Sequence, residues 1–81
     1  MLDERAEAAA YHRRCVELCT AASRPVAEFA KSLIYVARYH LSGGGGDIKL
    51  AREYLERVSG TNAEESSFAV EYLRKLGIGS H

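Results

Sequence analysis

The sequence predicts an all-α fold in which short loops join antiparallel helices. Apolar residues recur at spacings of three and four along most of the 81-residue chain, which places them on one face of a helix. Proline and glycine fall between these stretches, and strand-like alternation of apolar and polar residues is absent. Four helices are therefore expected, over about residues 3–23, 25–42, 47–59 and 62–76.

The two central helices organise the rest of the prediction. Pro25 suits a first helical turn because its missing N–H has no partner there, so a helix is expected to begin near residue 25. Gly43–Gly46 should end this helix, Asp47 should cap the next one, and Gly60 should close it in a left-handed conformation. The predicted core stripes are Val26, Phe29, Ala30, Leu33, Val36, Ala37 and Leu41 on the first helix and Ile48, Leu50, Ala51, Tyr54, Leu55 and Val58 on the second.

The flanking helices are expected to cover this central pair. The stripe predicted for residues 3–23 is Ala8, Tyr11, Cys15, Leu18, Cys19 and Ala22. Before the last helix, Asn62 with Glu65 has the form of a capping box, and Thr61 with Glu64 is the competing register. The last helix should bury Phe68 or Ala69, Tyr72, Leu73 and Leu76, and then end at Gly77 with an apolar contact from Ile78.

Composition narrows the class of protein. Eleven basic residues balance 11 acidic ones, so no net charge attracts nucleic acid or an anionic membrane. No apolar run suffices for a membrane span or a signal peptide. Cys15 and Cys19 stand one helical turn apart, which favours free thiols and an intracellular, reducing compartment. One domain is expected over residues 1–78, and Gly79–His81 resembles an expression tail.

The central pair resembles a tetratricopeptide repeat. The residues that carry the resemblance are Leu33, Val36, Ala37 and His40, followed by Ala51, Leu55 and Val58. The run 33–41, together with the helix containing Tyr11–Leu18, is similar to the C-terminal repeats of the subunit 8 family of the anaphase-promoting complex (cell division cycle protein 23 homologues). The resemblance implies a fragment of a right-handed α-α superhelix, which acts without catalysis as a scaffold in a ubiquitin ligase of the cell cycle, in the nucleus or cytoplasm.

A second row on the helix at 25–42 is the candidate binding surface. It consists of Lys31, Ile34, Arg38 and Leu41, which lie away from the core stripe and should face water in a small bundle. In repeats of the resembled kind this face lines the concave groove, where Arg38 would hold a partner carboxylate and Ile34 and Leu41 would bury an apolar anchor. Burial of the row by an adjacent repeat, or by a second copy of the chain in a homodimer, is the alternative.

Other groups of residues could suggest a metal site, a phosphate loop or catalysis, but structural roles are favoured for them. His12, Cys15 and Cys19 share a helical face and would form a metal site only with a fourth ligand, which the sequence does not offer nearby, so neither metal nor cofactor is expected. Gly43–Gly46 lacks the Gly-Lys-Ser/Thr ending of a phosphate loop, and the serines lack a base partner, so an enzyme is not predicted. Tyr35 and Tyr39 would form a stacking surface beside Arg38, or serve as half-buried packing residues.

Overall fold

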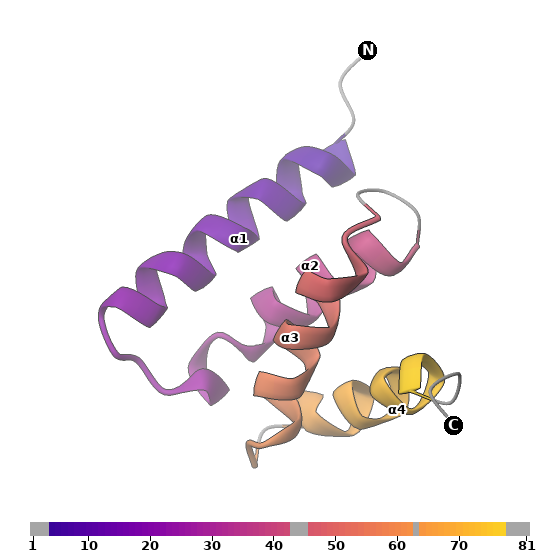
Figure 1. The fold of residues 1–81 in the computed structure, drawn as a ribbon. Helices are drawn as coiled ribbons and strands as arrows, with labels where there is room; N and C mark the ends of the chain where they lie inside the picture. The colour runs from indigo at the N-terminus through magenta and orange to yellow at the C-terminus, as the bar shows by residue number, and fades with distance from the viewer. Residues whose placement is uncertain (1–3, 43–45, 63, 78–81) are drawn as a thin grey trace.

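The computed structural model describes residues 4–42, 46–62 and 64–77, and this part of the chain is all-α. Its elements are the helices α1 (Glu4–Ala21), α2 (Ala30–Leu41), α3 (Ile48–Ser59) and α4 (Glu65–Gly77), with a short 3-10 turn, η1 (Val26–Glu28), before α2 (Figure 1). The predicted fold class is confirmed. Predictions that concern Gly43–Gly45, Ala63, Ile78 and the tail 79–81 lie outside the described residues.

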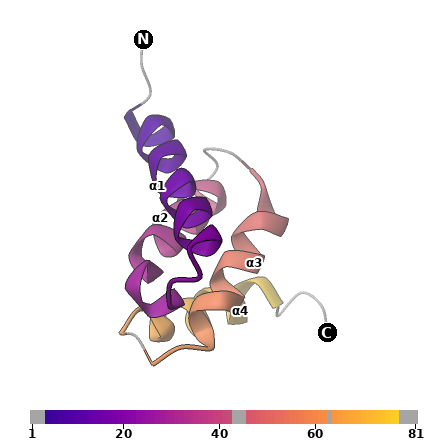
Figure 2. The same cartoon turned by 90° about the vertical axis from the view of Figure 1, so that its left-hand side faces the viewer.

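Each helix packs mainly against its neighbour in the sequence: α1 against α2, α2 against α3, and α3 against α4. The first three helices run alternately up and down, and α4 crosses below the α2–α3 pair (Figures 1 and 2). A hydrogen bond from Arg5 Nη2 to Ser42 Oγ, 3.5 Å long, joins the start of α1 to the end of α2, as antiparallel packing requires. α4 also contacts α2, which matters for the site described below.

The core lies between α2 and α3. The small residues Ala37 and Ala51 are fully buried and allow close approach of the two helices, beside the fully buried Leu33 and Leu55. The predicted stripes are confirmed here, except that Ile48 is exposed. The buried cluster consists of Val16, Phe29, Ala30, Leu33, Ile34, Val36, Ala37, Ala51, Tyr54, Leu55, Val58 and Ala69.

The stripe predicted for the first helix is wrong at Tyr11, Leu18 and Ala22, which are exposed, whereas Ala8, Cys15 and Cys19 are half-buried. Tyr11 and Leu18 are 66% and 60% exposed, whereas Ala9 and Val16 are buried against α2. Residues 9 and 16 lie seven positions apart, which is about two helical turns, so they share one face of α1 just as the residues of the predicted stripe would. α1 is rotated so that its smaller residues face the core, and Cys19 packs at the edge of the cluster.

The predicted start of the second helix is also wrong. Pro25 is extended, with φ −60° and ψ 137°, and precedes η1 instead of beginning an α-helix. Phe29 has φ −125° and ψ 23°, which interrupts the helical path before α2 begins at Ala30. Its ring is buried, and the guanidinium carbon of Arg57 lies 5.7 Å from the ring centroid. Burial of Phe29 against α3 therefore accompanies the break in the helix.

Ser23 closes α1 in the left-handed region, with φ +58°. The N–H of Arg24 donates to the carbonyl of Cys19 over 2.9 Å and that of Ser23 to the carbonyl of Thr20 over 3.0 Å. These two bonds form a Schellman motif, in which glycine is the preferred residue at the left-handed position. The loop after α1 thus contains a strained serine at a position that suits glycine.

Replacing Ser23 by Gly is expected to raise the free energy of unfolding by about 1 kcal/mol, because glycine adopts positive φ without steric cost. Urea unfolding followed by far-ultraviolet circular dichroism would measure the change. Ser42→Gly is the matched control: Ser42 has φ −87°, and its hydroxyl donates to the carbonyl of Tyr39, so this variant should lose stability. A loss of stability in Ser23→Gly would contradict the left-handed assignment.

Gly60 stands at the C-cap of α3 as predicted, but the left-handed conformation predicted for it is wrong. Gly60 has φ −85° and ψ 4°, which any residue adopts. Thr61 contributes to the end of α3, because both its N–H and its hydroxyl donate to the carbonyl of Val58, over 3.0 and 2.7 Å. At the other end, the predicted cap is confirmed, since a carboxylate oxygen of Asp47 accepts from the N–H of Leu50 over 3.0 Å. Gly46, just before Asp47, has a positive φ of +72°.

The two glycines should therefore respond oppositely to alanine. Gly60→Ala is expected to raise the free energy of unfolding by about 0.5 kcal/mol, because it restricts the unfolded chain and its Cβ would meet no atom closer than 3.9 Å. Gly46→Ala should lower it by about 1 kcal/mol because of its positive φ. Thermal unfolding of the two variants side by side measures the difference, and equal effects would contradict the backbone assignment.

The last helix begins later than predicted. α4 starts at Glu65, so neither Asn62 nor Thr61 stands at its N-cap position, and both capping-box registers are wrong. Of the two open choices for its core residue, Ala69 is fully buried and Phe68 is 59% exposed. Tyr72, Leu73 and Leu76 are half-buried and pack against the core, as expected. None of the helices in the described ranges combines the length and apolar character that a bilayer crossing requires.

Candidate functional site

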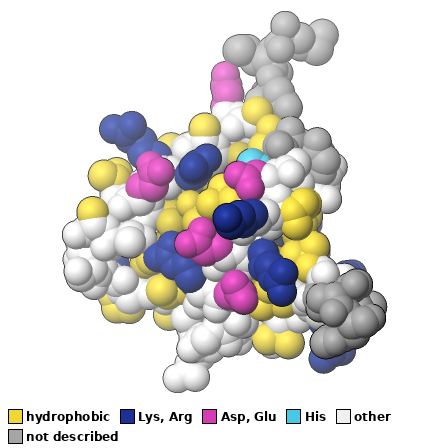
Figure 3. Space-filling view, in the orientation of Figure 1, with side chains coloured by type: hydrophobic (Ala, Val, Ile, Leu, Met, Phe, Trp, Pro, Cys, Tyr) yellow, Lys and Arg dark blue, Asp and Glu magenta, His cyan; other side chains and the backbone are white. Residues whose placement is uncertain are grey.

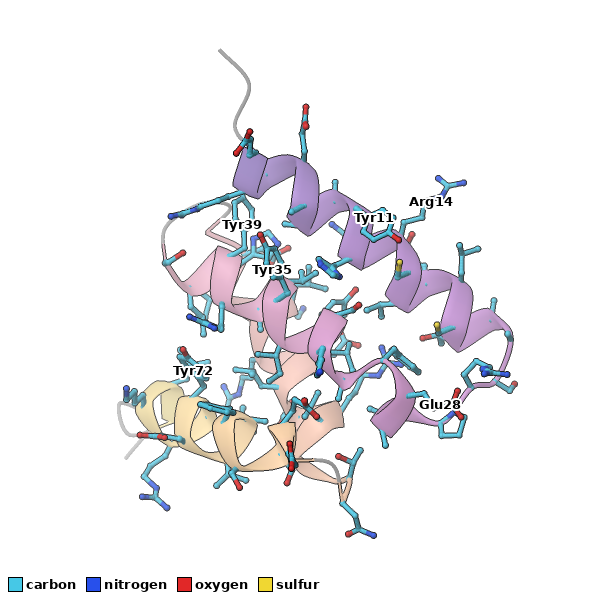
Figure 4. All side chains as sticks on the ribbon, turned by 180° about the vertical axis from the view of Figure 1, so that it is seen from behind. Tyr11, Arg14, Glu28, Tyr35, Tyr39 and Tyr72 are labelled. Carbon is cyan, nitrogen blue, oxygen red and sulfur yellow. The ribbon has the colours of Figure 1, made fainter. Side chains whose placement is uncertain are left out.

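An open groove lies between α2 and α4. Figure 4 shows Tyr35 and Tyr39 on α2 and Tyr72 on the side of α4 that faces α2. Two adjoining hollows of about 440 and 310 Å³ make up the groove, and both are lined by Tyr35, Arg38 and Tyr72. Arg38 therefore borders both halves of the groove, and these shared residues mark its centre.

The larger hollow lies at the C-terminal end of α2 and is additionally lined by Arg5, Tyr39, Leu41 and Ser42. Arg5 reaches it from α1, and its guanidinium donates to the Ser42 hydroxyl, which in turn donates to the carbonyl of Tyr39 over 3.1 Å. Leu41 supplies half-buried aliphatic surface. One end of the groove therefore combines a guanidinium with apolar and aromatic walls.

The smaller hollow is additionally lined by Lys31 and Ile34 from α2 and by Glu65 and Phe68 from α4. Ile34 is 8% exposed and belongs to the core cluster, whereas Phe68 is largely exposed. Lys31 is exposed, and Glu65 is half-buried. This end of the groove thus has an aliphatic residue at its base and an exposed aromatic ring on its wall.

All four residues of the predicted binding row line the groove: Lys31, Ile34, Arg38 and Leu41. One part of the prediction is wrong, because Ile34 is buried where it was expected in water; Leu41, which was also placed in the core stripe, is half-buried. The reason is that α4 folds against α2 and covers part of this row. Whether the row binds a partner stays a prediction.

Sequence reasoning missed the residues that other helices bring to the groove. Arg5 comes from α1, and Glu65, Phe68 and Tyr72 come from α4. Phe68 was the signal in the sequence that could have indicated this surface. Only one of Phe68 and Ala69 fits the core stripe of the last helix, so burial of Ala69 leaves an aromatic side chain outside the core. The two tyrosines of α2 were weighed as a stacking surface or as packing residues, and Tyr35 remains partly exposed in the groove.

Among the described residues that line the groove, basic side chains outnumber acidic ones. Arg5, Lys31 and Arg38 line it with Glu65 as the acidic lining residue, although the whole chain has equal numbers of basic and acidic residues. On the opposite face, basic and acidic side chains are intermingled (Figure 3). Within the described ranges, neither Lys31 nor Arg38 has an ion-pair partner, in contrast to Arg24, which contacts Glu28 at 2.7 Å. The groove is therefore a locally positive surface.

The sequence analysis considered His12, Cys15 and Cys19 as metal ligands and favoured structural roles for them. His12 Nδ1 lies 2.9 Å from Ser32 Oγ, and its ring lies 4.6 Å from that of Tyr35, so the imidazole packs against α2. Cys15 and Cys19 are free thiols. No group of three or more histidine, cysteine or acidic side chains in the described part of the chain is arranged to hold a metal ion.

Three other polar side chains, of His40, Tyr54 and Arg57, have surroundings that indicate structural roles. His40 accepts a hydrogen bond at Nδ1 from the N–H of Asp47 over 3.4 Å, which links the end of α2 to the cap of α3. Burial raises the pKa of the Tyr54 phenol, and the nearby charges of Arg13 and Arg57 oppose that rise. Arg57 also donates to the Thr20 hydroxyl over 2.9 Å. These contacts lie outside the groove and connect α3 to its neighbours.

No protein-family model, curated protein or solved structure matches this chain. The class that the structure defines is an all-α protein of successively packed helices with an open, positively charged groove.

Proposed function

We propose that this chain is a protein–protein interaction module that binds a segment of a partner protein in the groove between α2 and α4. The observation that carries the proposal is a groove with aromatic and aliphatic lining that also contains Lys31 and Arg38, neither of which has an ion-pair partner within the described ranges. Aromatic residues and arginine are enriched in protein interfaces because they offer large contact areas and several hydrogen-bond donors. The proposed role is binding without catalysis.

The tetratricopeptide resemblance supports the same role. It assigns α2 and α3 to the two helices of one repeat, α1 to the end of the preceding repeat, and α4 to the start of the next repeat or to a capping helix. In such an arrangement the first helix of each repeat lines the concave face, which corresponds to α2 and α4 here. By the resemblance to subunit 8 of the anaphase-promoting complex, we extend the proposal to scaffolding within a multi-subunit ubiquitin ligase of the cell cycle.

Site-specific photo-crosslinking tests the proposal. The photoreactive amino acid p-benzoylphenylalanine would replace Phe68 in the groove or, as a matched control, Tyr11 on α1. Both native residues are aromatic and similarly exposed, but Tyr11 does not line the groove. After irradiation in cells that express the chain, we expect position 68, but not position 11, to capture a distinct protein. Adding Arg38→Glu should abolish that adduct.

Two outcomes would count against a partner-binding groove. The same proteins captured from positions 68 and 11 would indicate contact without a specific site. Capture of only a second copy of the chain from position 68 would favour the self-associating bundle instead, and sedimentation velocity would then detect a dimer.

A further inference from the structure

The proposed partner segment can be defined further by the chemistry of the groove. We infer that the groove selects an acidic peptide segment in which a carboxylate lies between two apolar side chains. This inference rests on the proposed function, and it adds the chemical class of the partner and the order of its anchors.

The order follows from the layout of the two hollows. Each hollow has its own aliphatic residue, Leu41 in the larger and Ile34 in the smaller, and each is also bordered by tyrosine. Arg38 borders both hollows and is exposed. A bound segment that places one apolar side chain in each hollow therefore runs past the Arg38 guanidinium at a point between those two side chains. A carboxylate at that point would accept two parallel hydrogen bonds from the guanidinium.

The charge of the segment follows from the lining. Lys31 stands by the smaller hollow and Arg5 by the larger, so each hollow has its own basic residue in addition to Arg38. Neither Lys31 nor Arg38 has an ion-pair partner within the described ranges. Electrostatic complementarity therefore favours an acidic segment and disfavours a basic one.

The length of the segment follows from α2. From Lys31 to Ser42, at the two ends of the groove, an α-helix rises about 16 Å. An extended chain covers that distance with about five residues. The groove is thus long enough for two apolar anchors with an acidic residue between them.

A peptide fits the lining better than a single-stranded nucleic acid does. The tyrosines and Arg38 would stack on bases, but Ile34 and Leu41 are aliphatic and complement aliphatic side chains. Nucleic-acid binding is therefore an outcome that the experiment must be able to detect.

The test uses a random peptide library displayed on phage, selected against the whole chain. We expect the enriched peptides to share an aspartate or glutamate between two apolar residues. A synthetic copy of the most enriched peptide should bind Arg38→Glu at least about 10-fold more weakly than the unchanged chain. Arg52→Glu, the same change at an exposed position of α3 outside the groove, should alter the affinity less than about twofold.

A second pair of variants tests the apolar part. Phe68→Ser should weaken the same peptide about 10-fold, whereas Leu18→Ser, at an equally exposed site on α1, should leave the affinity unchanged. Circular dichroism of each variant verifies that the helices remain folded, as expected for substitutions at exposed side chains.

The outcomes separate this inference from the proposed function. Enrichment of basic or uncharged peptides, or binding that is insensitive to Arg38→Glu, would overturn the acidic motif while leaving a protein-binding module. Enrichment of no peptide at all, or preferential binding of a mixed-sequence single-stranded oligonucleotide, would overturn both.

Discussion

Replacing Leu55 by Ala is expected to lower the free energy of unfolding by about 3 kcal/mol. Leu55 is fully buried on α3 and belongs to the cluster that joins α3 to α2. The substitution removes apolar contact and leaves a cavity that the tightly packed helix pair can fill only in part. In a chain of 81 residues this is a large fraction of the total stability. Urea unfolding followed by circular dichroism measures the change.

Leu18→Ala provides the control for Leu55→Ala. Leu18 is a helical leucine that is largely exposed, so its truncation should change stability by less than about 0.5 kcal/mol. Similar losses in both variants would contradict the assignment of the core to the α2–α3 pair.

Replacing Ile34 by Asp is expected to lower the free energy of unfolding by about 3 kcal/mol at neutral pH, because it removes a buried apolar side chain and introduces a carboxylate there. The exposed neighbours Lys31 and Arg38 offset only part of this cost. Burial raises the folded-state pKa of the introduced carboxyl above its unfolded value of about 3.9. Below that value the group is neutral in both states, so the stability loss should be smaller at acid pH and grow as the pH rises.

Val70→Asp is the control for Ile34→Asp, since Val70 is 45% exposed in the middle of α4 and outside the groove lining. It should lose less than about 1 kcal/mol. The comparison of Ile34→Asp with Val70→Asp also tests whether α4 covers Ile34 or leaves it exposed to water. If α4 left Ile34 in water, as the sequence suggested, the two variants would behave alike.

The two central helices could be predicted because the spacing of their apolar residues is compatible with one arrangement of buried and exposed faces. The apolar residues of α2 and α3 include large side chains such as Leu33, Val36 and Leu55 at helical spacing, and burying them leaves the charged residues outside. Asp47 has a local capping role that needs no tertiary information. These features depend on residues near one another in the sequence.

α1 could not be oriented in the same way. Two rows of residues satisfy helical spacing, one with Tyr11 and Leu18 and one with Ala9 and Val16. The larger side chains belong to the row that the structure exposes. The smaller row faces α2, and the periodicity within α1 alone does not distinguish it.

Loop conformations were the least predictable local features. Glycine was expected to supply the left-handed turn at Gly60, yet among the described residues the positive φ values occur at Ser23 and Gly46. Phe29 interrupts the helix expected from Pro25, and its ring is buried beside Arg57 of α3. Such conformations depend on distant packing partners as well as on local preference.

The sequence by itself determined the all-α class, the central helix pair and the residues of the row that lines the groove. Only the tertiary structure decided that α4 crosses α2. In this arrangement Ile34 is buried, Phe68 is exposed, and Tyr72 lines the groove together with Arg38. The physical reason is that periodicity is a property of one helix, whereas a groove requires the relative placement of two.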